Sequence, residues 1–245
     1  MKKKILIAIL GLFIIISIQK ICLGNENDYK VYNSWEYNSN QTDENTKILF
    51  IIDFSNSMND TMHGERKIDI AVNTLASITS KLSSDAYTGL RVYGHKFGFN
   101  NLIGCRASEL VNSIKKNNSA NIYNSLRKIQ ASGWTPITYS LKQAVNNDFY
   151  GLTGKKHIIL LTDGGENCDE SPCEYAIKLV QQRDDIKIDV IAFALDDDLA
   201  NAQLKCTALV TSGKLYEADN AESLSNSLED ALNVTTEVQG TIIKK

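Results

Sequence analysis

Two aspartates of this chain each close a long apolar run. Asp53 ends the run over residues 47–53, and Asp163 ends the run over residues 157–163. Runs as apolar as these are typical of strands that are buried on both faces. The carboxyl ends of parallel strands meet at one edge of a sheet, and ligands bind beyond that edge. We therefore expect the two carboxylates to lie at the same edge of the fold.

Three hydroxyl residues accompany these acids. Ser55 and Ser57 follow Asp53, and Thr135 lies in the loop over residues 133–136 that opens a helix. Two carboxylates and three hydroxyls form an all-oxygen ligand set, which hard cations such as Mg2+ prefer. Mn2+ and Ca2+ are the alternative ions. A cation with so few acidic ligands keeps residual Lewis acidity and an open coordination position.

Each of these residues also has an ordinary structural explanation. An aspartate after a strand is commonly a turn or capping residue. Thr135 before Pro136 is a good helix start, with the threonine as N-cap and the proline at the first helical position. Ser55 and Ser57 could be plain loop hydroxyls, and Glu166 either tunes the site or lies in solvent. The combination, rather than any single residue, favours metal binding.

From residue 47 onward the chain alternates between strand-like and helix-like segments. Apolar runs predict strands, and apolar residues spaced by three and four predict helices with one buried face. The strands are expected over residues 47–53, 90–94, 110–114, 157–163, 189–195 and 214–218, and the helices over residues 68–82, 122–129, 136–145, 175–182, 200–210 and 221–234. This alternation predicts one α/β domain over residues 47–236, a Rossmann-like three-layer sandwich. Its central sheet would be doubly wound and mostly parallel, flanked by helices on both faces, with 110–114 as one short antiparallel edge strand.

The five candidate ligands resemble the metal-ion-dependent adhesion site of von Willebrand factor type A domains. In that motif D-x-S-x-S follows the first strand, a threonine lies in a middle loop, and an aspartate follows a later strand. All five positions are matched here, by Asp53, Ser55, Ser57, Thr135 and Asp163. The segments Asp-Phe-Ser-Asn-Ser-Met, Gly-Trp-Thr-Pro-Ile and Leu-Thr-Asp-Gly-Gly-Glu-Asn-Cys look like those of secreted bacterial members. Asn56 stands where many members have glycine, and asparagine tolerates the left-handed conformation.

The resemblance implies a role for each ligand. Ser55, Ser57 and Thr135 would offer hydroxyl oxygens to the metal, and Asp53 and Asp163 would hold it mainly through bridging waters. The sixth position would accept an Asp or Glu carboxylate from a partner protein, so chelation would abolish binding. In some relatives ligation also shifts the last helix, which here lies over residues 221–234. The resemblance thus implies a metal-dependent protein-binding module for cell adhesion, and not an enzyme.

Two other functions compete with adhesion. A Mg2+-dependent phosphohydrolase of the haloacid dehalogenase type also places an aspartate after its first strand. It normally has a general acid two residues later, where this chain has Ser55. The acidic run over residues 196–198 could imitate a later motif of such enzymes. The third possibility is a scaffold with an unused metal site. Nucleic acid is not an expected partner, because the formal net charge is -3.

Both ends of the chain carry other signals. Residues 2–4 are lysines, residues 5–18 are mostly apolar, and small residues follow at positions 22 and 24, which is typical of a signal peptide over residues 1–24. The apolar run is short for a membrane span. We therefore expect a secreted or periplasmic protein, held to a membrane only if the signal stays uncleaved. Residues 25–46 are polar and predict a linker, and residues 237–245 a C-terminal tail.

The cysteines agree with export. Removal of the signal would leave Cys105, Cys168, Cys173 and Cys206, an even number that suggests two disulfides in an exported chain. Three connectivities are possible. The short spacing of Cys168 and Cys173 favours a local loop, which would pair Cys105 with Cys206. A structural zinc site is the alternative, but it needs C-x2-C-like pairs that this sequence does not have.

Overall fold

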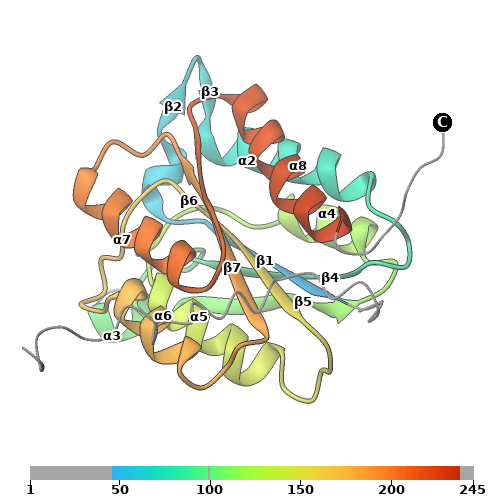
Figure 1. Cartoon of the computed structure of the whole chain (residues 1–245). Coiled ribbons are helices and arrows are strands. Elements are labelled where there is room, and N and C mark those ends of the chain that lie inside the picture. Colours follow the sequence, from blue (N-terminus) through green and yellow to red (C-terminus); the bar gives the residue numbers. More distant parts are fainter. Residues whose placement is uncertain (1–45, 99, 238–245) are drawn as a thin grey trace, which may run out of the picture. The chain divides into compact units, whose positions relative to one another are not determined.

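The computed structural model describes residues 46–98 and 100–237, and a six-stranded sheet forms its centre (Figure 1). The strands are β1 (Lys47–Asp53), β4 (Tyr87–Tyr93), β5 (Ser108–Lys115), β6 (Lys156–Thr162), β7 (Ile186–Phe193) and β8 (Leu215–Ala218). Their order is β5-β4-β1-β6-β7-β8. All neighbours are parallel except β4 and β5. The predicted sheet with one antiparallel edge strand is confirmed, and that strand is longer than expected.

Helices cover both faces of this sheet (Figure 1). One face carries α2 (Lys67–Ser80), α4 (Ser119–Leu126) and α8 (Ala221–Glu237), and the other carries α5 (Ile137–Gln143), α6 (Pro172–Val180) and α7 (Asp198–Val210). The side chains of β1 are all buried and alternate between the two faces. Phe50 belongs to the core beneath α2 and α8, whereas Ile51 belongs to the core beneath α5 and α7. The three-layer architecture is therefore confirmed.

Some features of the chain fall outside this description. The predicted signal peptide, nearly all of the predicted linker and residues 238–245 of the tail are not among the described residues. Within residues 46–98 and 100–237, no helix is both long enough and apolar enough to cross a membrane.

The structure adds short elements that were not predicted. The 3-10 turn η1 (Asn56–Asn59) follows β1, and a hairpin joins β2 (Thr61–Met62) to β3 (Glu65–Arg66). The helical turn α3 (Asn101–Gly104) lies between β4 and β5, and the π-helical segment η2 (Ala144–Asp148) continues α5. Elements this short show no apolar period of their own, and the period is the signal from which the other elements were predicted.

Two disulfides are present, but the predicted pairing is wrong. Cys105 is bonded to Cys168, and Cys173 is bonded to Cys206. Cys173 lies in the first turn of α6, which packs along α7, where Cys206 lies. Cys168 lies in the loop after β6, beside the residue that follows α3. Cys168 and Cys173 are close in sequence, but each lies beside a different element of the fold and is bonded to a cysteine there.

Candidate metal centre

The two predicted carboxylates lie close together at the carboxyl edge of the sheet. β1 pairs with β6 in parallel, and Ile52 lies opposite Leu161. Asp53 therefore ends its strand beside Thr162, and Asp163 comes one residue later. Asp53 is fully buried and Asp163 is 6% exposed. Two carboxylates with so little access to water need other partners for their negative charge.

Hydrogen bonds join four of the five candidate ligands. The backbone N–H of Ser55 donates to Asp53 Oδ1 at 2.6 Å. The hydroxyl oxygens of Ser55 and Ser57 are 3.1 Å apart, and Ser57 Oγ donates to Asp163 Oδ1 at 2.7 Å. Thr162 Oγ1 donates to the second oxygen of Asp53, Oδ2, at 2.7 Å. The structure thus brings both aspartates and both serines into one cluster of oxygen atoms.

The loop that carries Thr135 is fixed against this cluster through its backbone. Ser55 forms a parallel bridge with Gly133, and Asn56 N–H donates to Gly133 O at 3.0 Å. Gly133 N–H in turn donates to Gly94 O at 2.6 Å. Gly94 has a φ of +71°, and a Cβ there would lie 2.6 Å from Ser55 N, so only glycine allows this approach. Thr135 is 5% exposed and lies two residues after the bridge.

Thr135 does not cap the helix that follows it, so the capping explanation is wrong. Pro136 holds the N-cap position of α5 rather than the first helical position, and no side chain caps it. The reason lies in the loop after β6, whose Asn167 Oδ1 accepts a hydrogen bond from the backbone N–H of Thr135 at 2.7 Å. This bond holds the Thr135 backbone toward the Asp163 loop.

Glu166 links the same two loops. Its Oε2 accepts a hydrogen bond from Thr138 N–H at 2.7 Å, and its Oε1 accepts one from Cys168 N–H at 2.9 Å. Burial raises the pKa of Glu166, and the backbone hydrogen bond from Thr138 acts in the opposite direction. Glu166 is therefore neither a solvated loop acid nor a candidate ligand. With Asn167, which the sequence analysis missed, it is a positioning residue for the Thr135 loop.

Replacing Asn167 by Ala should weaken metal binding although Asn167 is not a proposed ligand. Mutation of a residue that orients a metal ligand typically lowers the metal affinity by about 10- to 100-fold. We expect Asn167→Ala to bind Mg2+ about tenfold more weakly in a calorimetric titration. The control Asn201→Ala, which removes an exposed hydrogen bond to Glu217, should bind as the wild type does. Wild-type affinity in Asn167→Ala would show that the Thr135 loop needs no such support.

A lysine that the sequence analysis missed also reaches the cluster. Lys67 is the first residue of α2, and its Nζ donates to Asp163 Oδ2 at 3.0 Å and to Ala194 O at 3.5 Å. The Lys67 side chain is 15% exposed, and the Asp163 side chain is 0% exposed. One feature of the sequence could have identified Lys67. A cation at the first position of a helix is unfavourable beside the positive end of the helix dipole, so a lysine there suggests a compensating acidic partner.

The electrostatics of the cluster favour a bound cation. Burial, followed by the negative charge of Asp163, raises the pKa of Asp53 to about 6. Burial also raises the pKa of Tyr93 well above its usual range, and the charge of Asp53 adds to this effect. The cluster therefore combines two buried aspartates with one lysine, Lys67, which pairs with Asp163.

The donor set fits a hard divalent ion. It offers carboxylate and hydroxyl oxygens, with Thr135 on the adjoining loop, and Mg2+ prefers oxygen ligands of these kinds. In the part of the chain that the structure describes, no three His, Cys, Asp or Glu side chains are grouped so that they could hold a metal. A metal ion at this edge would therefore depend on the hydroxyl oxygens as well as on the two aspartates.

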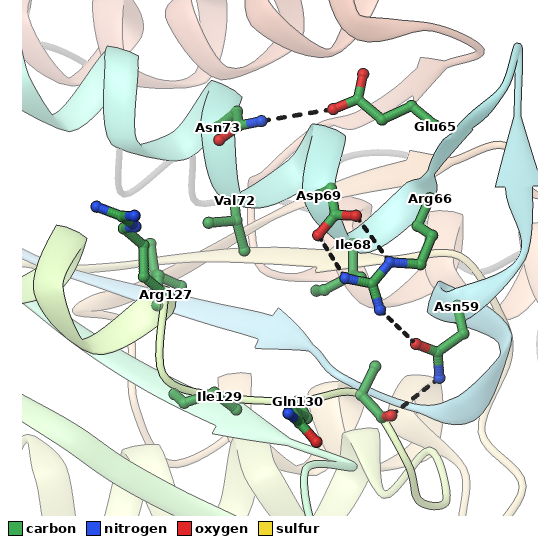
Figure 2. A pocket seen from close by; sticks show the side chains of 12 residues that line it. Asn59, Glu65, Arg66, Ile68, Asp69, Val72, Asn73, Arg127, Ile129 and Gln130 are labelled. Carbon is green, nitrogen blue, oxygen red and sulfur yellow. Dashed lines mark hydrogen bonds and ion pairs between the residues drawn. The ribbon is translucent and has the colours of Figure 1, made fainter.

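A polar pocket of about 640 Å3 lies beside η1 (Figure 2). Arg66 forms two hydrogen bonds with Asp69, at 2.7 and 2.8 Å, and a third with Asn59 Oδ1 at 3.4 Å. Asn59 Nδ2 donates to Ala131 O at 2.9 Å. Figure 2 shows this row of contacts running from α2 across the pocket. The row ties η1, which begins after Ser55 and contains Ser57, to the segment that leads into the Thr135 loop.

Comparisons with known proteins agree with this architecture. The family model of the von Willebrand factor type A domain matches residues 47–231. Two proteins of Bacillus subtilis (strain 168), both described as uncharacterized, are similar in sequence. YwmD is 32% identical over 202 residues, which cover 80% of this chain and 88% of YwmD. YwmC is 30% identical over 175 residues, which cover 70% of this chain and 76% of YwmC.

Solved structures share the fold. A von Willebrand factor type A protein from Catenulispora acidiphila has a TM-score of 0.61 and 20% identity, over 81% of this chain and 44% of that one. Proximal thread matrix protein 1 from the mussel byssus, solved with a zinc-occupied adhesion-site motif, has a TM-score of 0.60 and 20% identity, over 79% of this chain and 46% of that one. Identities this low show the fold alone, and this chain spans less than half of each. The family model and YwmD show more: the chain belongs to the von Willebrand factor type A domain family.

Proposed function

We propose that this protein is an exported, non-enzymatic module that binds a carboxylate of a partner protein through one divalent ion. Members of this family commonly bind proteins through such a metal. The observation that carries the proposal is the hydrogen-bonded cluster of Asp53, Ser55, Ser57 and Asp163, with the Thr135 loop packed against it. In the sequence, these five residues match the metal-ion-dependent adhesion site motif in the order that it requires.

Mg2+ is the proposed ion, with Mn2+ and Ca2+ as alternatives. Ser55, Ser57 and Thr135 would supply hydroxyl oxygens, and Asp53 and Asp163 would hold the ion mainly through water. A divalent ion with so few acidic ligands supplies a strong attraction for one further carboxylate. Because the mussel byssus protein has been solved with zinc at such a motif, Zn2+ belongs in the titration series.

The charge of the site supports an acidic partner group. The two aspartates balance the two positive charges of a divalent ion, and Lys67 adds a further positive charge beside Asp163. A site with surplus positive charge attracts a carboxylate and repels a cation. The proposed partner is therefore a protein that presents Asp or Glu at an exposed position.

Binding is better supported than phosphate-ester hydrolysis. Ser55 stands where a haloacid dehalogenase-type enzyme needs its general acid, and its backbone N–H is bonded to Asp53. The acidic run over residues 196–198 has a structural role, because Asp197 Oδ1 accepts hydrogen bonds from Leu199 N–H and Ala200 N–H at the start of α7. Ser55 thus stands in place of the general acid, and Asp197 of the acidic run caps α7.

Export is supported by two independent features. The cationic and apolar start of the sequence is typical of a signal peptide. Disulfides persist in oxidising compartments and are rare in the cytosol, and the structure has two. A secreted or periplasmic location is therefore proposed.

Magnesium titration distinguishes a working site from a scaffold with an unused one. Saturating Mg2+ should raise the thermal unfolding midpoint of the metal-free protein by several degrees, because a ligand that binds only the folded state stabilises it. Asp53→Ala should show no rise. The control Asp85→Ala, which changes an exposed acid paired with Lys116, should respond as the wild type does. An unchanged wild-type midpoint would favour the scaffold.

Partner capture tests the second half of the proposal. The immobilised wild-type protein is incubated with native extracellular material in Mg2+ or in EDTA. We expect proteins that are retained in Mg2+, released by EDTA and absent from a matrix that carries Asp53→Ala. Identical retention in all three lanes would contradict carboxylate capture through a metal, even if the metal itself binds.

A further inference from the structure

We propose that the partner surface extends from the metal site onto α3, and that the partner's acidic residue is flanked by large apolar side chains. This inference rests on the proposed function, because it describes what surrounds the carboxylate at the same site. It is carried by the exposure, the anchoring and the length of the connection between β4 and β5.

Large exposed apolar side chains concentrate in this connection. Leu102 is 75% exposed, Phe97 is 66% exposed and Ile103 is 54% exposed. Residues 100–104 include no charged side chain. A single exposed leucine needs no explanation, but apolar side chains that gather on a surface are typical of interaction sites. Residues 100–104 therefore have the composition of a contact surface rather than of a solvated loop.

The turn α3 is fastened to both loops of the metal site. Cys105, which follows α3 directly, is bonded to Cys168 in the loop after β6. On the other side, a Cβ added to Gly104 would lie 2.3 Å from Cδ1 of Trp134, so the α3 backbone rests on the indole ring of that residue. Trp134 precedes Thr135 in the chain. The apolar turn is thus held at a fixed place next to the candidate ligands.

The connection is far longer than its structural task requires. β4 and β5 are antiparallel neighbours, and two to five residues suffice to join such strands. Here residues 94–107 lie between them. Long connections inside a compact domain are commonly functional. The connection begins at the carboxyl end of β4, which is parallel to β1, so Leu102 and Ile103 lie at the edge of the sheet where the metal site lies.

The metal ion and the apolar turn α3 would contribute differently to the binding of one partner. The metal would fix the position of one carboxylate, which gives orientation but little discrimination between acidic proteins. Burial of neighbouring apolar side chains on Leu102 and Ile103 would add affinity and select among them. The partner is accordingly an exposed protein segment with Asp or Glu beside large apolar residues.

Selection of displayed peptides tests this chemistry without knowledge of the partner. Random peptides with one fixed central aspartate are selected on the full chain with both disulfides formed, in Mg2+, and are eluted with EDTA. We expect large apolar residues to be enriched beside the aspartate. A synthetic peptide of the selected sequence should bind Leu102→Ser/Ile103→Ser about tenfold more weakly than the wild type.

Three measurements make the result specific. The Mg2+ affinity and the thermal unfolding midpoint of Leu102→Ser/Ile103→Ser should stay at the wild-type values. Leu209→Ser, which changes a leucine of α7 with 57% exposure, should bind the peptide as the wild type does. The peptide should not bind Asp53→Ala, because the metal and the apolar turn are expected to act together.

The failures of the two proposals can be told apart. EDTA-eluted peptides without apolar preference, or equal affinity for the wild type and Leu102→Ser/Ile103→Ser, would overturn the assignment of α3 and leave the metal-dependent function standing. Self-association of the wild type that is lost in this double variant, without any peptide preference, would assign α3 to a second copy of the chain and also overturn it. If Mg2+ binds but EDTA elutes no peptide, carboxylate capture itself is wrong.

Discussion

Metal-free Asp53→Asn protein is expected to be more stable than the metal-free wild type at neutral pH, by about 2–3 kcal/mol. The wild-type carboxyl group is fully buried, and burial together with the charge of Asp163 raises its pKa from 3.8 to about 6. A raised pKa means that the folded state disfavours the ionised form. Asparagine has nearly the same volume and no charge, so it removes this cost.

The hydrogen bonds around Asp53 can accept an asparagine. The carbonyl oxygen of the new side chain can take the hydrogen bond that Ser55 N–H now donates to Oδ1. Its NH2 group would face Thr162 Oγ1, which lies 2.9 Å from Gly164 O and can donate its proton there instead. The substitution therefore removes a buried charge and keeps a hydrogen-bond partner for both the oxygen and the nitrogen of the new side chain.

The gain in stability should follow the ionisation of Asp53. Well below pH 4 the wild-type carboxyl group is protonated in the folded and unfolded states alike, and the two proteins should be equally stable. As pH rises from about 4 to about 6, only the folded wild type retains the proton, so its stability falls relative to the variant. Above that range the difference should stay constant.

Urea denaturation in EDTA across this pH range measures the difference. Asp85→Asn, at an exposed acid, should show no comparable gain. Saturating Mg2+ should reverse the order, because it stabilises the wild type and not Asp53→Asn. Lower stability of metal-free Asp53→Asn at neutral pH would contradict the burial of an ionised carboxylate.

Lys67→Met should bind Mg2+ about tenfold more tightly than the wild type. The Lys67 ammonium lies 3.0 Å from Asp163 Oδ2, where it competes with the metal for this carboxylate and repels a divalent charge nearby. Methionine fills a similar length without charge. Calorimetric titration with Mg2+ measures the gain directly.

The same substitution should destabilise the metal-free fold by about 2 kcal/mol, because it leaves the Asp163 carboxylate without its partner. Lys81→Met is the matched control. Lys81 follows α2 at its other end and pairs with Glu229, but both side chains are exposed, so the pair contributes little and lies away from the site. Weaker Mg2+ binding by Lys67→Met would contradict the competition and would mean that Lys67 helps to organise the site.

The sheet and the acids at its edge could be predicted because they depend on local patterns. The apolar run over residues 47–53 coincides with β1, and the run over residues 157–163 differs from β6 by one residue at each end. Strands buried on both faces must be continuously apolar. The meeting of Asp53 and Asp163 then follows from a general property of parallel sheets rather than from any detail of side-chain packing.

The supporting contacts could not be predicted because they join distant segments. Lys67 and Asp163 are 96 residues apart in sequence, and Asn167 and Thr135 are 32 apart. Nothing in a local pattern states which lysine will reach which carboxylate. The turn α3 was not predicted for another reason, since apolar residues in a four-residue helix show no period.

Diffraction from crystals prepared with Mn2+ in place of Mg2+ tests the metal site most directly, since the anomalous signal of manganese locates the ion without assumption. We predict one strong anomalous peak among the hydroxyl oxygens of Ser55, Ser57 and Thr135, with Asp53 and Asp163 around it. A peak only elsewhere on the protein, or none at a concentration of Mn2+ that raises the unfolding midpoint in solution, would contradict the proposed site.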